Sequence, residues 1–252
     1  MIADVLASLQ HDPSRPRLTT HTPAGRTELS GTALLNWAAK VAGLLVDELG
    51  TRCGDQVLLA TPANWQSAGI LLGAWWAGLT VASDADSEVA AAFVPPGGDA
   101  DADEVFVVSG HPLGLATRDL LPHQRDFTTS VLGQADRFSP RFAPDPTAAV
   151  RSHGQVRSVG EFRAAIAAAS PVGLNQRVLT AGDWSLDGEV PAVVTLLLQP
   201  LAAGASVIHC TDLDPLGAQA DAADRATLAH RAAVERADFT IGVDVAGLPR
   251  LG

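Results

Sequence analysis

The fold class is most legible in residues 54–83, which read GDQVLLATPANWQSAGILLGAWWAGLTVAS. The short apolar run from Val57 to Ala60 is typical of a parallel strand covered on both faces. An apolar segment of helix length follows, then Gly78, and then the β-rich run from Thr80 to Ser83. This order predicts a strand–helix–strand unit, and such crossovers are right-handed in nearly all proteins.

A helix precedes this unit, and the whole series then occurs a second time. Ser30 is placed to cap a helix whose apolar residues recur at helical spacing as far as Leu49. The same order of helix, strand, helix and strand returns within residues 155–214, with Gly204 in the place of Gly78. Residues 28–86 and 155–214 therefore form an approximate internal repeat.

Two such units predict an α/β protein with two pseudo-repeated lobes, each built on a mostly parallel sheet flanked by helices. We place the first lobe in residues 1–140 and the second in residues 147–252, joined by the proline-rich segment 137–146. The remaining apolar patterns predict strands at 89–94, 105–109 and 239–243 and a helix at 215–236.

Composition excludes several classes of protein. The chain has 252 residues, 47% of them hydrophobic and 18% charged, as in a globular protein. Its net charge of -11 repels phosphate backbones and anionic lipids, so we expect no nucleic-acid or membrane partner. The N-terminus lacks a signal-peptide pattern, so we expect a cytoplasmic protein. Cys53 and Cys210 stand alone, without the spaced partners of a metal site.

Residues 28–86 resemble the opening of the adenylate-forming superfamily, which includes acyl-CoA synthetases, peptide-synthetase adenylation domains and luciferases. The shared pattern is a capped helix, a Gly-Asp-x-Val strand, a Pro-x-Asn turn and a helix that ends in Ala-Gly. Residues 177–210, RVLTAGDWSLDGEVPAVVTLLLQPLAAGASVIHC, are similar to a later segment that ends in Pro-Leu-x-x-Gly-Ala. Residues 234–251 are similar to the next segment of the superfamily. The resemblance implies the fold of the superfamily's N-terminal domain.

The resemblance does not extend to the superfamily's catalytic motifs. That chemistry joins a carboxylate to ATP and needs a Ser/Thr/Gly-rich loop with a lysine, which precedes a Ser/Thr-His pair matched here by Ser152-His153. Residues 138–146 stand in its place and contain neither glycine nor lysine, and their prolines lack the N–H of a phosphate cradle. The nucleotide motifs and the lysine-bearing C-terminal domain would follow residue 252. We therefore expect a truncated, degenerate relative without catalytic residues or autonomous adenylation.

Two pairs of residues are candidates for ligand binding. Asp183 and Trp184 follow the predicted strand 178–181, at the strand end where open α/β sheets place ligands. The alternative is that Trp184 is an aromatic plug. Arg151 and His153 follow the place of the missing phosphate loop and could contact an anion. Their alternative role is a turn that leads into a helix capped by Ser158.

Three classes of function remain open. We expect first a non-catalytic binding or assembly module without cofactors, which self-associates or binds a protein partner over surface that the superfamily buries. The alternatives are a protein that binds an acyl-adenylate, or AMP or ATP with Mg²⁺, and an enzyme, which is either an AMP-dependent ligase completed by another chain or an enzyme with a new reaction on this fold. The charge of the cleft between the lobes distinguishes a nucleotide-binding protein from a binding or assembly module, because a nucleotide site needs converging arginines or helix N-termini.

Overall fold

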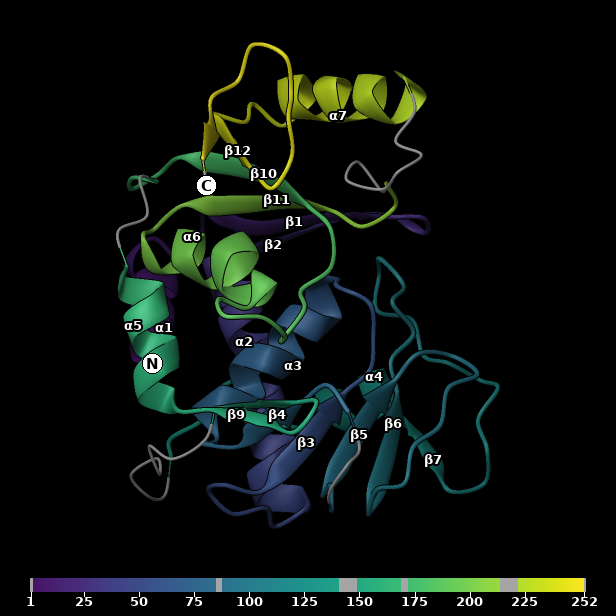
Figure 1. Cartoon of the computed structure of the whole chain (residues 1–252). Coiled ribbons are helices and arrows are strands. Elements are labelled where there is room, and N and C mark those ends of the chain that lie inside the picture. Colours follow the sequence, from purple (N-terminus) through teal and green to yellow (C-terminus); the bar gives the residue numbers. More distant parts are fainter. Residues whose placement is uncertain (1, 85–87, 141–148, 169–171, 214–221, 252) are drawn as a thin grey trace.

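The computed structural model describes residues 2–84, 88–140, 149–168, 172–213 and 222–251 (Figure 1). Its α-helices are α1 (Ile2–His11), α2 (Gly31–Gly43), α3 (Trp65–Trp76), α4 (Phe127–Leu132), α5 (Val159–Ala167), α6 (Gln199–Ala202) and α7 (Ala222–Val234). Two π-helical turns, η1 (Leu44–Glu48) and η2 (Val194–Leu198), continue α2 and lead into α6. The strands are β1 (Pro16–Thr22), β2 (Gly25–Ser30), β3 (Gln56–Leu59), β4 (Thr80–Ala82), β5 (Ala91–Val94), β6 (Glu104–Val107), β7 (Gln124–Asp126), β8 (Val150–Ser152), β9 (Gln155–Arg157), β10 (Arg177–Ala181), β11 (Ser206–Cys210), β12 (Phe239–Ile241) and β13 (Arg250–Leu251).

These strands form two mostly parallel sheets, which confirms the predicted α/β class. Sheet A has six strands in the order β13-β12-β10-β11-β1-β2, and sheet B has seven in the order β7-β6-β5-β3-β4-β8-β9. The antiparallel pairs are the hairpins β1–β2 and β8–β9, each at a sheet edge. Each sheet therefore has a parallel centre and one edge hairpin.

The two predicted strand–helix–strand units lie near the middle of the two sheets. In sheet B, β3 and β4 pair in parallel with Val57 opposite Val81, and α3 connects them. In sheet A, β10 and β11 pair in parallel with Val178 opposite Val207, connected through η2 and α6. A helix precedes each unit, α2 in the first and α5 in the second. Both halves thus have the order that the sequence repeat suggests.

The sheets do not coincide with the predicted lobes 1–140 and 147–252. The hairpin β1–β2 belongs to sheet A, where Thr20 pairs with His209, and the hairpin β8–β9 belongs to sheet B, where Val150 pairs with Val81. Pairing over such sequence distances has no local signal, so the repeat alone cannot assign the hairpins to a sheet. The predicted linker 137–146 and the start of the predicted helix 215–236 lie partly outside the described residues.

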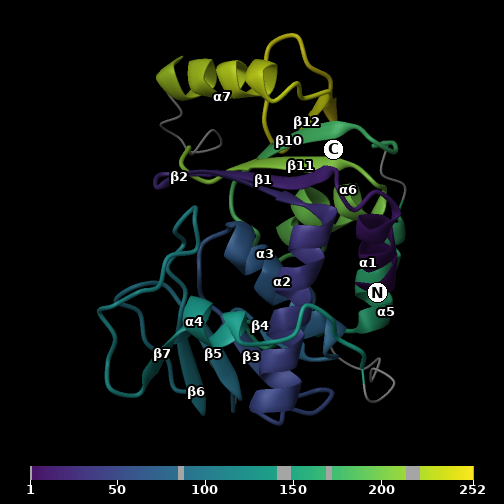
Figure 2. The same ribbon diagram turned by 180° about the vertical axis from the view of Figure 1, so that it is seen from behind.

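Helices fill the space between the sheets. Figures 1 and 2 show α1, α2, α3, α5 and α6 between sheets A and B, with α7 on the opposite, outer face of sheet A. Gly73 allows α3 to approach α2 closely, because a Cβ at this position would lie 2.6 Å from the carbonyl oxygen of Ala38. In the described part of the chain, no helix combines the length and the hydropathy needed to cross a bilayer.

Side-chain caps begin the helices that position the cleft. Ser30 accepts a hydrogen bond from the amide of Ala33, as predicted, and Ser158 forms a capping box with Glu161. Asn64 caps α3 by accepting from the amides of Gln66 and Ser67. Two backbone N–H groups in the first turn of α3 therefore already donate to the capping side chain.

Candidate functional site in the cleft between the sheets

A cavity of about 460 Å³ lies where strand ends from both sheets meet, and we call it the central cavity. It is lined by residues 59–63, Ser67, Leu71, Ser83, Pro95 and 183–187. Apart from Ser67 and Leu71 of α3, these residues lie at or follow the carboxyl ends of β3, β4, β5 and β10. Parallel α/β proteins bind ligands at this edge, and the volume falls within the usual range for small molecules, about 300–1,000 Å³.

The hydroxyl groups on the wall of the central cavity are bonded to one another. Thr61 Oγ1 lies 2.9 Å from Ser67 Oγ, which also donates to the carbonyl oxygen of Pro62. Ser83 Oγ lies 2.7 Å from Ser152 Oγ on the neighbouring strand β8. The wall is therefore polar, but these hydroxyl groups already have hydrogen-bond partners within the chain.

Asp183 and Trp184, the predicted binding pair, both line this cavity. Asp183 is exposed, and its Oδ1 accepts a hydrogen bond from the amide of Trp184. Trp184 is only 6% exposed, and its ring lies over the imidazole of His209 with centroids 4.6 Å apart. Trp184 is thus both a plug against sheet A and a part of the cavity wall, while Asp183 supplies a carboxylate.

His209 supports Trp184 from inside sheet A, and it is not among the residues that the sequence singled out. Its Nδ1 lies 2.7 Å from Thr180 Oγ1 on the adjacent strand. Complete burial lowers the pKa of His209 to about 3, although a backbone hydrogen bond with Gly182 partly opposes this shift. The imidazole is therefore neutral at physiological pH. A histidine within a mostly apolar strand, SVIHC, is the signal that could have pointed to a buried contact.

His153 lies on the other side of Asp187, beside a separate cavity of about 390 Å³ that we call the hairpin cavity. His153 (φ 45°) and Gly154 (φ 74°) form the turn of the β8–β9 hairpin, as two consecutive left-handed residues do in tight hairpins. The imidazole Nδ1 is 3.3 Å from Asp84 Oδ2, and its Nε2 is 3.7 Å from Asp187 Oδ2.

Arg151 does not join the other candidates. The backbone carbonyl of Arg151 accepts a hydrogen bond from the amide of Ser83. Arg151 lines neither the central cavity nor the hairpin cavity. The structure therefore unites Asp183 with Trp184, places His153 next to their loop, and leaves Arg151 apart. Binding by these four residues stays a prediction.

The ionisable groups on the wall of the central cavity are acidic. Among its described lining residues the ionisable ones are Asp183 and Asp187, with no arginine or lysine. Arg157, beside the hairpin cavity, donates to the carbonyl oxygen of Gly188. No group of three or more His, Cys, Asp or Glu side chains within the described ranges could hold a metal ion.

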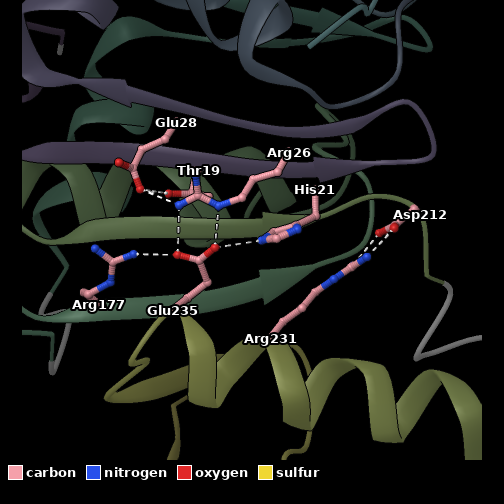
Figure 3. A network of polar contacts seen from close by, with 8 residues as sticks. All are labelled: Thr19, His21, Arg26, Glu28, Arg177, Asp212, Arg231 and Glu235. Carbon is pink, nitrogen blue, oxygen red and sulfur yellow. Dashed lines mark hydrogen bonds and ion pairs between the residues drawn. The ribbon is translucent and has the colours of Figure 1, made fainter.

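A second polar cluster, which the sequence did not reveal, lies on the outer face of sheet A (Figure 3). Glu235 is 6% exposed and accepts from Arg26 Nε at 2.6 Å and Arg177 Nη2 at 3.0 Å, and it lies 3.1 Å from His21 Nε2. The hydrogen bond from Arg26 lowers the pKa of Glu235, although burial opposes it. This network ties the segment after α7 to β1, β2 and β10. It lies on the face opposite to the central cavity.

Comparison with known proteins separates a close relative from distant structural neighbours. No family model matches the chain. A protein of Mycobacterium tuberculosis strain H37Rv, described as a TIGR03089 family protein, is 36% identical over 218 residues, which cover 82% of this chain and 87% of that protein. This identity and coverage establish a family relationship.

Solved structures of CoA ligases share the fold. A benzoate CoA ligase from Burkholderia xenovorans LB400 matches with a TM-score of 0.71 at 14% identity, and the anthranilate CoA ligase AuaEII, solved with anthranoyl-AMP, matches with 0.70 at 12%. Each match covers 96% of this chain and 49% of the ligase, so the chain spans about half the length of these ligases. The N-terminal domain of FACL13 from M. tuberculosis matches with 0.68 at 13% identity, over 96% of this chain and 62% of that domain. The chain belongs to the TIGR03089 family and has the α/β fold of the N-terminal region of adenylate-forming ligases.

Proposed function

We propose that this chain is a non-catalytic binding protein, which holds a small ligand without phosphate groups in the central cavity. The observation that carries the proposal is the charge of that cavity, where the ionisable groups among the described lining residues are two carboxylates. A phosphate beside them would be repelled by about 1 to 4 kcal/mol per charge pair at 4 Å, for effective dielectric constants of about 80 to 20. The negative charge of the central cavity thus favours a binding module over a nucleotide site.

The surroundings of the cavity support the same conclusion. Adenylate formation needs cations or free N–H groups that stabilise charge on the transferring phosphoryl group. The first turn of α3 borders the cavity, but Asn64 already accepts from two of its amides. Arg157 donates to a backbone carbonyl of the loop that follows β10. We therefore expect neither AMP nor ATP with Mg²⁺ as a cofactor. A cytoplasmic location is a separate part of the proposal.

Pyrophosphate exchange tests the absence of catalysis directly. The purified chain, incubated with ATP, Mg²⁺ and a panel of aliphatic and aromatic carboxylic acids, should give no exchange above the protein-free blank. An authentic CoA ligase in the same buffer serves as the positive control. Exchange that depends on one of the acids would overturn the proposal and favour an enzyme, alone or as part of a larger assembly.

Thermal unfolding tests binding in the central cavity. AMP, ATP and a non-hydrolysable acyl-adenylate should leave the melting temperature unchanged, whereas phosphate-free fragments should include hits. A ligand at about a hundredfold its Kd adds roughly 2.7 kcal/mol of stability, which is on the order of 5–10 °C for a chain of this size. Ala60 is exposed and lines the cavity, so Ala60→Trp should abolish these shifts by filling the space. A shift with AMP instead would support the nucleotide-binding alternative.

Self-association or a protein partner is a further part of this proposal. Leu113, Leu115 and Leu121 are between 48% and 80% exposed on the segment between β6 and β7, an unusual density of large apolar side chains at a surface. Sedimentation equilibrium of the purified chain should therefore give a mass above 26.0 kDa. A strictly monomeric mass would count against self-association and would leave the partner to be sought elsewhere.

A further inference from the structure

A third cavity, of about 320 Å³, lies beside the central cavity, and we call it the proline cavity. It is lined by residues 22–24, 62–64, 95–96, 108–110 and Thr211. These segments follow the carboxyl ends of β1, β3, β5, β6 and β11, so five strands from both sheets converge on it. Pro62, Ala63 and Pro95 line both cavities and form the partition between them.

None of the described residues that line the proline cavity carries a charge. The chain as a whole has a net charge of -11. The uncharged wall distinguishes the proline cavity from the central cavity, which has two carboxylates. A charged ligand would lose its hydration here without gaining an opposite charge, which is strongly unfavourable. The chemistry of the wall therefore selects against ionic ligands.

The polar side chains of this wall already have partners within the chain. Thr22 Oγ1 accepts from the amide of Ala24, and Asn64 Nδ2 donates to the carbonyl oxygen of Pro62. Ser109 Oγ accepts from the amide of His111, and Thr211 Oγ1 donates to the carbonyl oxygen of His21. The cavity consequently offers a ligand mainly carbon surface, with few free hydrogen-bonding groups.

Four prolines, at positions 23, 62, 95 and 96, make the rim of the cavity stiff. Gly110 adopts a left-handed conformation (φ 63°) that other residues rarely adopt, so the turn at this corner of the wall requires glycine. A preformed wall reduces the entropy lost on binding. We propose that the proline cavity is a second binding site, for a compact uncharged ligand with an apolar body, such as an aryl group without carboxylate, phosphate or ammonium. The proposal does not depend on the use of the central cavity.

Three probes of equal size test the selectivity. Ligand-observed fluorine NMR of the purified chain would measure 4-fluorobenzyl alcohol, 4-fluorobenzoate and 4-fluorobenzylamine at neutral pH. The alcohol should bind at least tenfold more tightly than either ion. Equal affinity of the three probes, or no binding of the alcohol, would overturn the proposal.

Matched variants locate the bound alcohol. Ala24 and Ala60 are both exposed, and each lines only one of the two cavities. Ala24→Trp should weaken binding of the alcohol at least fivefold, whereas Ala60→Trp should leave it within twofold of the parent chain. Ser109→Asp introduces a charge into the proline cavity and Ser185→Asp introduces one into the central cavity. This second pair of variants repeats the comparison if one of the tryptophan variants does not fold.

The pattern across the variants separates this proposal from the proposed function. If Ala60→Trp and Ser185→Asp abolish binding of the alcohol, but Ala24→Trp and Ser109→Asp do not, the alcohol binds in the central cavity. That result would overturn the second site and support binding in the first. Pyrophosphate exchange, in contrast, would overturn the proposed function and leave the second site standing.

Discussion

Sheet A buries polar side chains on both of its faces, and the two faces stabilise them in opposite ways. On the inner face, Thr180 and His209 share a neutral contact of 2.7 Å beneath Trp184. On the outer face, Arg26 and Arg177 donate to the carboxylate of Glu235. The alternation of side chains along β10 and β11 separates these groups, because Leu179 and Ile208 pack in the same apolar cluster as Leu228 of α7.

This difference shows that burial can be accommodated either by neutrality or by complete pairing. Burial lowers the pKa of both His209 and His21, but His21 also contacts a carboxylate that opposes the shift. The inner face therefore depends on His209 staying neutral. The outer face depends on Glu235 keeping its cationic partners, because a buried charge that loses its partner is costly.

The largest effect should follow from removing the central carboxylate of the outer face. Glu235→Ala leaves Arg177, which is 21% exposed, and Arg26 without their shared acceptor. We expect a loss of about 2 kcal/mol in the free energy of unfolding, measured by urea denaturation, because the hydrogen bonds to the carboxylate are lost while both arginines can still reach water. The exposed pair Asp244–Arg250 provides the matched control, since Asp244→Ala should change stability by less than about 0.5 kcal/mol. Equal effects of the two variants would contradict the importance of the network.

The next effect concerns the inner face and depends on pH. The unfolded chain binds a proton on His209 near pH 6.5, whereas the folded chain does so only near its pKa of about 3. Stability should therefore fall as the pH drops below 6.5, by about 1.4 kcal/mol at pH 5.5 relative to pH 8. His209→Asn should remove this part of the pH dependence while leaving any contribution of His21. Identical slopes for the two proteins would show that His209 does not titrate as proposed.

A smaller effect separates packing from hydrogen bonding among the buried tryptophans. Trp75 Nε1 donates to the carbonyl oxygen of Ala149 at 2.9 Å, whereas Trp184 Nε1 has no hydrogen-bond partner among the described residues. Both rings are at least nine-tenths buried. Trp75→Phe should therefore cost about 1 kcal/mol more than Trp184→Phe, because it removes a buried hydrogen bond, even though the Ala149 carbonyl keeps the amide of Val81 as a donor. Thermal and urea unfolding of both variants would measure the difference, and the reverse order would imply that Trp184 has an unrecognised partner.

The sequence predicts the parts of the molecule whose determinants are local. The strand–helix–strand units and the caps Ser30 and Ser158 follow from short apolar runs and capping residues, and they are present. The position of Asp183 and Trp184 at a strand end also follows from local order. The Glu235 network could not be predicted this way, because His21 and Arg177 lie 214 and 58 residues from Glu235. The pairing of β1 with β2 and β11, and of β11 with β10, brings these charges together.

The smallest effect tests where the outer network ends. Glu28 is 32% exposed and pairs with Arg26, which is itself 44% exposed. Exposed pairs contribute little, so Glu28→Gln should cost about 0.5 kcal/mol or less in urea denaturation at 0.15 M salt, and even less at 1 M salt. Arg26 keeps Glu235 as a partner in this variant, so the central carboxylate stays bonded. A loss close to that of Glu235→Ala would mean that the network acts as one unit. The distinction between a buried centre and a solvated rim would then fail, and with it the physical contrast between the two faces of sheet A.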